Sequence, residues 1–222
     1  MPDTFAPLTW DAVSKRFFEN GVSKVALFPM NDDGTYAAGV AWNGITAVNV
    51  TPEGGEPTDL WANNKKYASM MSAEQIKGTI EAYTYPDEFG ACNGEAALAT
   101  GAYAHQQTRK RFGLCFRTEI GNDVTQKAGY KLHFLYGCLA KPSSVNHETT
   151  NDSPDAQPFS WDFDTAPVTV AGMDDTAYIE VDSRKFTDSN LSKLTALETK
   201  VYGSTTAAAA MPDPAFIITT LT

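Results

Sequence analysis

The chain has 222 residues, a length that suits one large domain or two small ones. Its 27 Asp and Glu residues outnumber 17 Lys and Arg residues, and the net charge of −10 disfavours electrostatic binding to nucleic acid or to an anionic membrane. With 42% hydrophobic and 20% charged residues, the composition is typical of a globular protein and excludes a disordered chain or a coiled coil.

The three cysteines, Cys92, Cys115 and Cys138, stand far apart along the chain. An odd, sparse set without a CxxC pair argues against a disulfide framework and a zinc ribbon, so we expect reduced thiols. No run approaches 18 consecutive apolar residues, which predicts no membrane span. The first 16 residues include Asp3 and Asp11 and lack an apolar core, so we expect no secretory signal and folding in a cytosol.

The N-terminal part of the chain predicts a short helix, a pair of strands and a long loop. Apolar spacing favours a helix over 11–19, and 22–28 is typical of a strand. A turn at 31–34 should let 35–42 return beside that strand. The segment 50–64 contains two prolines and two glycines and is interpreted as a long loop. Because compact domains seldom need such loops, we expect it to be functional or an interaction arm.

Alternation of apolar and polar residues predicts four strands in the centre of the chain. One is 75–85, which Pro86 ends. Two more, 112–118 and 130–139, should form an antiparallel pair with a long connection. The clearest alternation is 159–164 (FSWDFD), in which three aromatic side chains face one way and one Ser and two Asp face the other. This pattern fits a strand with one face on a core and one face in water.

The C-terminal part predicts a strand over 177–181 and then one helix. Thr187 and Asp188 can supply N-caps and Gly203 a C-cap. Between them lies an apolar stripe at helical spacing, formed by Leu191, Leu194, Leu197 and Val201. In the tail, 204–222, two prolines forbid a continuous helix. Its apolar end should therefore pack either on its own domain or on a neighbour.

Motifs that carry chemistry are absent: the sequence has no GxGxxG, GxxxxGK[ST], GxSxG or HExxH. His133 is interpreted as an ordinary strand residue, and His147 with Glu148 as a solvated pair in a polar loop. Asp162 and Asp164 have the spacing of a DxD metal motif, but alternation explains them as the polar side of a strand. We therefore predict no catalytic residue, no cofactor-binding residue, no metal ligand and no cofactor.

Residues 105–111 (HQQTRKR) form the one basic cluster of the sequence. The cluster could meet phosphates, but in an acidic chain an interface role, pairing with carboxylates of another subunit, is favoured. The residues thus describe an acidic, mostly antiparallel β protein with a helix near its end. Because exposed strand edges must be either blunted or used, such a protein is a candidate for ordered self-assembly.

Two other functional classes are compatible with the residues. A carbohydrate-binding β-sandwich would use Trp42, Trp61 and tyrosines as a stacking platform, although the tryptophans are dispersed and Trp161 is expected in the core. A hydrolase would rely on Asp162 and Asp164, which share one face of a strand. Rings or tubes of the purified protein, binding of a glycan by a monomer, or turnover of a substrate would separate the three classes.

Many stretches of the chain, in order, resemble the major tail protein, or tail tube protein, of long-tailed non-contractile bacteriophages of the Gram-positive-host type. The strongest is 79–89 (TIEAYTYPDEF), and the likeness covers about 17–203. The other stretches are 21–24, 39–48, 55–58, 64–67, 106–107, 112–118, 121–123, 129–133, 136–137, and 151–154 leading into 159–161. The segment 31–38 is a variable turn, and 204–222 keeps only part of the Leu/Pro-rich ending of the family, so its role stays open.

The resemblance implies a structural virion protein and not an enzyme. It implies one tail-tube domain over 1–222, a mainly β fold (antiparallel sandwich or partial barrel) with a C-terminal α-helix. Such proteins assemble into hexameric rings that stack into a tube, the conduit for DNA delivery into the host. The segment 50–67 is the expected long inter-subunit arm and 204–222 a C-terminal extension.

The expected partners are copies of the chain itself, the tail tape measure, the tail terminator and the baseplate or distal tail proteins. We expect the protein in the virion tail after assembly in the host bacterial cytoplasm, without a membrane. DNA should pass through the lumen without specific binding, because an acidic or neutral lumen repels it weakly, over about 8–10 Å at physiological salt. Candidates to face the channel are Glu81, Asp162 and Asp164.

Overall fold

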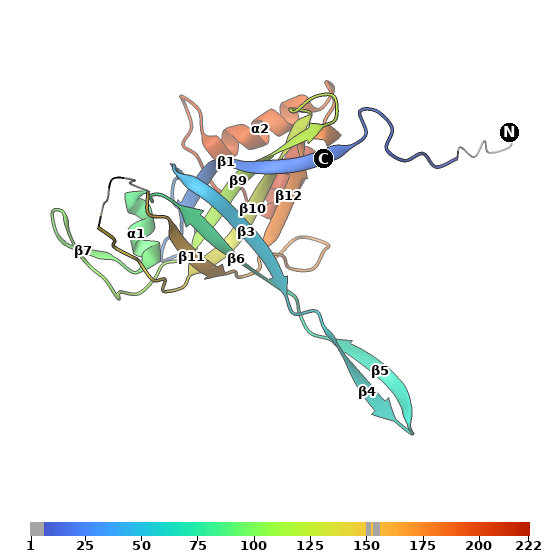
Figure 1. Ribbon diagram of the computed structural model, residues 1–222, viewed down its shortest axis with the longest axis horizontal. Coiled ribbons are helices and arrows are strands. Elements are labelled where there is room, and N and C mark those ends of the chain that lie inside the picture. Colours follow the sequence, from blue (N-terminus) through green and yellow to red (C-terminus); the bar gives the residue numbers. More distant parts are fainter. Residues whose placement is uncertain (1–6, 150–151, 153–155) are drawn as a thin grey trace.

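A computed structural model describes residues 7–149, 152 and 156–222 (Figure 1). Of the resembling stretch 151–154, residues 151, 153 and 154 lie outside the described residues. Eight strands form one antiparallel sheet: β1 (Phe17–Pro29), β2 (Val40–Ala41), β3 (Ile45–Glu53), β6 (Gln75–Ala82), β9 (Phe112–Asn122), β10 (Gly129–Ala140), β11 (Phe159–Asp164) and β12 (Tyr178–Asp182). Their order is β2-β1-β9-β10-β11-β6-β3, with β12 also paired to β10.

Two hairpins and three helices complete the described chain. The hairpins are β4 (Pro57–Ala62) with β5 (Lys65–Met71), and β7 (Ala96–Ala99) with β8 (Ala102–Ala104). The helices are α1 (Asp87–Asn93), α2 (Leu191–Tyr202) and α3 (Pro214–Leu221), with a short 3-10 turn at Ser183–Lys185. The expected class, mainly antiparallel β with a C-terminal helix, is confirmed.

Strand β10 is the corner at which the sheet folds into two layers. Its first half pairs with β12, and its end pairs with β11 through Leu139 and Ala140. Between these parts Gly137 has a φ of +57°, and an added Cβ would lie 2.8 Å from the carbonyl oxygen of Ala166. Glycine is the residue that adopts this bend without strain. The bend lets β3, β6 and β11 cross in front of β9 and β10 (Figure 1).

The first core fills the space between the two layers. As the alternation predicts, Trp161 and Phe163 of β11 point inward and are buried, whereas Asp162 stays exposed. Phe89 of α1 closes this core, with its ring centroid 5.1 Å from that of Trp161 and 5.5 Å from that of Phe112. Edge-to-face ring pairs at these distances are favourable, so α1 is held to the sheets by aromatic contacts.

The second core lies between helices α2 and α3 and the other face of the β1–β9–β10–β12 layer. Three residues of the predicted α2 stripe, Leu194, Leu197 and Val201, are buried there. Leu191, the first residue of α2, is 49% exposed. The helix is flanked by Asn190, not by the predicted caps at 187 and 188, and Gly203 ends it as expected.

The C-terminal tail packs on its own chain and forms a helix that the sequence did not predict. Pro214 stands in the first turn of α3, where a missing N–H costs nothing, and the Asp213 side chain accepts a hydrogen bond from the N–H of Phe216 (2.6 Å). Met211 and Ile217 are buried in the second core. No helix runs through 204–213, as the two prolines predict, and the second of them, Pro214, begins α3.

Two predictions for the N-terminal part are wrong. The expected helix over 11–19 does not form, because β1 already begins at Phe17 and pairs with β9. The expected loop over 50–64 is also wrong: β3 continues to Glu53, and β4 and β5 form a hairpin. Asn63 and Asn64 turn this hairpin with φ values of +51° and +59°, a conformation that Asn tolerates well. The return of 35–42 beside β1 is present as the two-residue β2, and Tyr36 forms a bridge with Met30 directly after β1.

Candidate functional site

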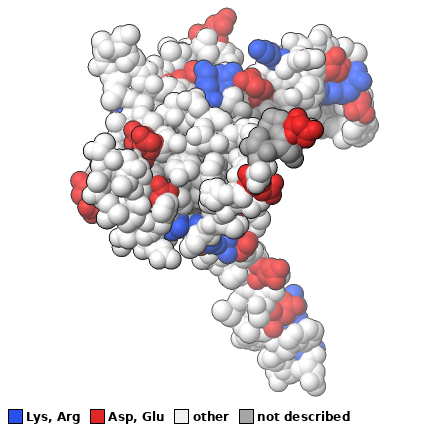
Figure 2. Space-filling model, turned by 60° about the vertical axis from the view of Figure 1, so that its left-hand side comes forward, with Lys and Arg blue, Asp and Glu red and all other residues white. Residues whose placement is uncertain are grey.

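The β4–β5 hairpin with its neck, residues 54–74, here called the arm, stands clear of the rest of the molecule (Figures 1 and 2). Every residue of both strands is exposed. Five of them are large apolar side chains with exposed fractions from 41% to 77%: Leu60, Trp61, Tyr67, Met70 and Met71. Exposed apolar side chains in such number on one hairpin make the arm a candidate interaction surface.

Few contacts inside the arm stabilise it. The Asp59 carboxylate accepts a hydrogen bond from Ser69 (2.5 Å) and pairs with Lys66 (2.7 Å), and both pairs are exposed to water. Exposed ion pairs contribute about 0–1 kcal/mol, and a lone two-stranded hairpin is marginally stable in water. A surface laid over the apolar side chains would therefore stabilise the arm as well as bind it.

The neck joins the arm rigidly to the sheet of the body. Strands β3 and β6 pair as far as Glu53 and Gln75, directly before the arm begins and after it ends. Gly54 has a φ of +86°, and a Cβ at this position would lie 2.6 Å from the carbonyl oxygen of Ala73. The N–H of Gly55 donates to the Ser72 hydroxyl (3.1 Å). The arm is thus a continuation of two body strands and its direction is set by them.

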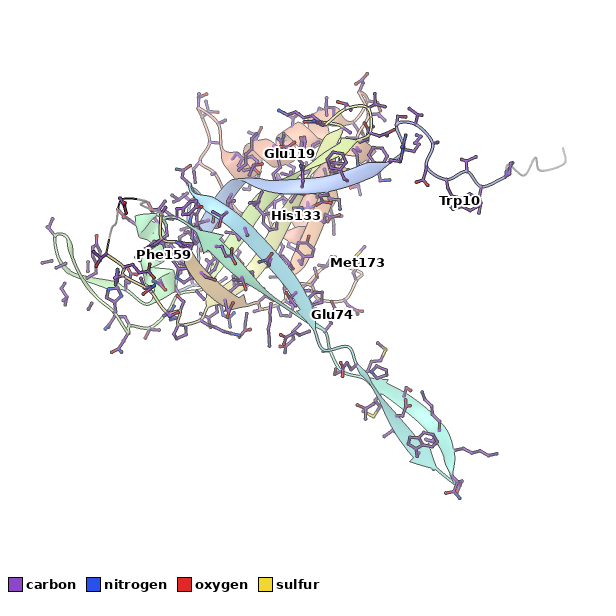
Figure 3. The ribbon with its side chains drawn as sticks, in the orientation of Figure 1. Trp10, Glu74, Glu119, His133, Phe159 and Met173 are labelled. Carbon is purple, nitrogen blue, oxygen red and sulfur yellow. The ribbon has the colours of Figure 1, made fainter. Side chains whose placement is uncertain are left out.

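The N-terminal segment is a second protruding apolar element. Leu8, Trp10 and Val13 are 69% to 78% exposed, and Figure 3 shows Trp10 well away from the body. The segment is anchored at its root, where Asp123 pairs with Arg16 (2.8 Å) and accepts from the N–H of Ser14 (3.3 Å). Like the arm, it offers an unburied aromatic side chain to another molecule.

Three edge strands have a partner on one side only in the described part of the chain. β2 pairs only with β1, β3 only with β6, and β12 only with β10. An unpaired edge presents a row of backbone donors and acceptors to which another chain can add a strand.

The structure brings the three predicted channel residues, Glu81, Asp162 and Asp164, onto one face of the β3–β6–β11 layer. Their cross-strand partners there are polar as well, as the register of β11 with β6 requires. The Asp162 carboxylate accepts from the Thr79 hydroxyl (2.8 Å), and Asp164 pairs with Lys141 (2.8 Å). This face is therefore polar and of mixed charge, and it turns away from the first core.

The arginines of the basic cluster serve the interior of their own chain. Arg111 donates to the carbonyl oxygen of Gly137 (2.6 Å), at the bend of β10. Arg109 donates to the carbonyls of Ala140 (3.5 Å) and Lys141 (3.4 Å). Both side chains are part-buried and donate to carbonyls of their own chain, and the expected pairing of the cluster with another subunit stays a prediction. They stabilise the corner of the sheet.

The tryptophan platform expected for a carbohydrate-binding module does not form. Trp42 is 3% exposed, and its indole N–H donates to the carbonyl of Thr84 (2.8 Å) inside the first core. Trp61 lies on the arm. Trp161 is buried, as predicted. The two tryptophans of the proposed platform thus belong to different parts of the molecule.

His133 stands in a polar cluster that the sequence did not indicate. It is 4% exposed; its Nε2 lies 2.8 Å from the Thr118 hydroxyl and its Nδ1 2.6 Å from the Tyr178 hydroxyl. Thr118 donates its proton to Glu19 (2.6 Å), so its oxygen accepts from Nε2–H, and Nδ1 accepts from Tyr178. Glu19, Thr118 and Tyr178 belong to three other strands, β1, β9 and β12. Residue spacing along the chain therefore carries no sign of this cluster.

Charged groups surround this histidine. The carboxylates of Glu19 and Glu180 lie 3.6 and 3.7 Å from its ring nitrogens, and both pair with Lys131. Burial lowers the pKa of His133, and the two carboxylates oppose that effect without reversing it. The neutral ring therefore joins β1, β9, β10 and β12 by hydrogen bonds.

The three cysteines are free, buried thiols. Burial raises the pKa of Cys92 and of Cys115 to about 12 and also raises that of Cys138. Thiols with such values are almost wholly protonated at neutral pH, so they are poor nucleophiles. Within 7–149, 152 and 156–222 we find no group of three His, Cys, Asp or Glu side chains arranged to hold a metal ion. The described part of the chain also has no helix of the length and apolarity that crossing a membrane requires.

The sequence and the structure were compared with those of known proteins. No protein-family model matches the sequence, and no curated protein matches it. Among solved structures, a chain of the cryo-EM structure of the anti-feeding prophage (AFP) baseplate, 6-fold symmetrised, is similar over 78% of this chain and 97% of its own. The identity is 12% and the TM-score 0.33, a likeness too low to decide fold or function.

Proposed function

We propose that this protein is a structural subunit of a phage tail, which assembles with copies of itself into stacked hexameric rings around a conduit for DNA. The observation that carries the proposal is the arm, in which five large apolar side chains are exposed on a hairpin without a core. The ordered resemblance of about 17–203 to tail tube proteins supports the proposal that the assembly is a tail tube with six subunits in each ring. No catalytic role is part of the proposal.

The geometry supports different contacts for the sheet edges and for the protruding segments. Unpaired edges at β3 and β12 suit contacts within a ring, because neighbouring sheets can continue one another until the ring closes. The arm and the N-terminal segment, which extend beyond the body, suit contacts between rings. Both kinds of contact join different surfaces of two identical chains. The contact within a ring repeats by rotation until the ring closes, whereas the contact between rings repeats along the tube without closing. The tape measure, terminator and baseplate proteins would meet the ends of the stack.

The polar face of the β3–β6–β11 layer is the proposed wall of the channel. It carries Glu53, Glu81, Asp162 and Asp164 against Lys77 and Lys141, an excess of negative charge that repels a DNA duplex weakly. We expect Asp162→Lys to leave tubes intact and to slow DNA ejection from assembled particles. Asp174→Lys, which makes the same charge change in an exposed loop, is the control. Normal ejection by the Asp162→Lys particles would contradict the charge argument.

Negative-stain microscopy of the concentrated full chain tests the assembly itself. We expect rings or tubes of uniform width, alone or after addition of a tail-tip complex as initiator. The double variant Trp61→Ser/Tyr67→Ser should stay folded, with an unchanged melting temperature, and form no tubes. Leu98→Ser/Tyr103→Ser, on the equally exposed β7–β8 hairpin, should still form them. A protein that stays solitary at high concentration with the initiator present would sink the proposal.

A further inference from the structure

A cavity of about 780 Å³ opens on the side of the body, between α1, the segment before β9, the end of β10 and the start of β11. Figure 3 shows Phe159, one of its lining residues, on the opposite side of the body from Glu74 at the base of the arm. Its volume falls in the range of small-molecule sites, about 300–1,000 Å³. Nothing in the proposed assembly function uses this cavity.

One wall of the cavity is aromatic and rigid. The rings of Phe159 and Trp161 stack with centroids 5.5 Å apart and planes 13° from parallel. Tyr85 stands perpendicular to both, with centroids 5.6 and 5.4 Å away. Phe159 and Tyr85 are part-exposed, so some ring surface remains free on this wall. The negative face of such a ring attracts partly positive C–H groups, such as those on the apolar face of a pyranose.

The other wall carries fixed hydrogen-bonding groups. The Glu95 carboxylate accepts from the Asn93 amide (2.8 Å) and the Tyr85 hydroxyl (3.2 Å), both through Oε1, and its side chain is 8% exposed. A carboxylate has about four acceptor positions, so Glu95 keeps acceptor capacity for a ligand hydroxyl, although its Oε2 lies close to Gly90 of α1. Arg109 is held by Asn93 and two backbone carbonyls through one nitrogen, Nη1, which leaves its other donors for a ligand.

The charges of the lining select the class of ligand. Among the described lining residues, one carboxylate, on Glu95, is balanced by one guanidinium, on Arg109; the imidazoles of His105 and His147 also line the cavity, and Nδ1 of His105 lies 4.0 Å from Oε1 of Glu95. A balanced site favours a neutral polar molecule over an anion or a cation, because neither sign of charge finds an excess of the other. We infer that this cavity binds a neutral saccharide, with the pyranose on Phe159 and Tyr85 and its hydroxyls on Glu95 and Arg109.

Saturation-transfer NMR and titration calorimetry of the full chain test the inference. The neutral probes are maltotriose and an N-acetylglucosamine trisaccharide; a glucosamine and a galacturonic acid trisaccharide provide the cationic and anionic comparison. We expect saturable binding of a neutral probe, weakened about tenfold by Glu95→Gln and about three- to tenfold by Phe159→Leu. Glu88→Gln, an exposed carboxylate on α1, should bind as the original chain does.

Three outcomes would overturn the inference: no binding of either neutral probe, tighter binding of a charged probe than of both neutral ones, or unchanged binding by Glu95→Gln and Phe159→Leu. If Phe159→Leu does not fold, Tyr85→Phe, which removes the hydroxyl that holds Glu95, replaces it with the same expected direction. The result is independent of assembly. The arm variant Trp61→Ser/Tyr67→Ser should retain saccharide binding, and Glu95→Gln should still form tubes.

Discussion

Two antiparallel hairpins of the molecule, β9–β10 and β4–β5, differ in how far their side chains are buried. In β9–β10, Leu132 and Phe134 face the second core, whereas Leu114 and Leu135 face the first, so the hairpin is covered on both sides. In β4–β5, the arm, every residue is exposed although both strands carry large apolar side chains. The difference shows that burial of a hairpin depends on what packs on it. In the proposed assembly, the surface that covers the arm comes from another molecule.

The largest expected effect that tests this comparison is on hydrogen exchange. In the unassembled protein, amides of β4 and β5 should exchange through local opening that costs roughly 0–2 kcal/mol. Amides of β9 and β10 should require global unfolding, at about 5–15 kcal/mol. Mass spectrometry of the exchanged peptides measures both. Equal protection of the two hairpins in the monomer would contradict the difference in burial. Additional protection of the arm in tubes would support its burial by another subunit.

Truncation of one side chain in each hairpin should give the next largest difference. Phe112→Ala removes a fully buried ring from β9 and should lower the free energy of unfolding by about 3–5 kcal/mol. Tyr67→Ala removes a ring that is 77% exposed and should change it by less than about 0.5 kcal/mol. Urea denaturation of the monomer measures both values. A large loss for Tyr67→Ala would mean that the arm is packed within its own chain.

The bend at Gly137 is the feature that lets β10 serve both layers. Gly137→Ala should lower the free energy of unfolding by about 2–3 kcal/mol, because the left-handed backbone and the contact with Ala166 both oppose a side chain. Gly172→Ala has a similar φ, +77°, but open space around the added methyl, and should cost about 1–2 kcal/mol. Equal losses in denaturant titrations would show that the close approach to Ala166 contributes nothing.

The smallest expected effect concerns pH and the His133 cluster of the body. The folded state lowers the pKa of His133 below its ordinary 6.5, so the unfolded chain binds the proton more readily. The free energy of unfolding should therefore fall as pH drops below about 6.5. His133→Gln should reduce that fall between pH 7.5 and 5.5 in urea titrations. A variant with the same slope as the original chain would show that another group titrates.

Much of the body was predictable because a local pattern reports the burial of its strands. The alternation in 159–164 predicted both the strand and the burial of Trp161 and Phe163, and three of the four residues in the predicted stripe of α2 are buried. One prediction failed because proline and glycine occur in hairpins as well as in loops: the Pro/Gly content of 50–64 concealed a hairpin. In the tail the prolines prevent a continuous helix, as predicted, but the sequence did not show that Pro214 begins α3.

The candidate sites were less accessible to the sequence. The exposure of the arm, the partners of His133 and the walls of the saccharide cavity each join residues that are distant along the chain. No spacing rule connects Tyr85, Glu95 and Phe159. The basic cluster looked like a surface, and only the fold shows that Arg109 and Arg111 donate to carbonyls at the corner of β10.

The sequence by itself determined the acidic charge, the antiparallel β class and the inward faces of several strands, since composition and local periodicity decide these properties. The tertiary structure decided which apolar residues remain uncovered. Trp42 and Trp61 are chemically the same, yet one closes a core and the other lies exposed on the arm. Solvent exposure is a property of all the surrounding chain, and long-range packing is what assigns it.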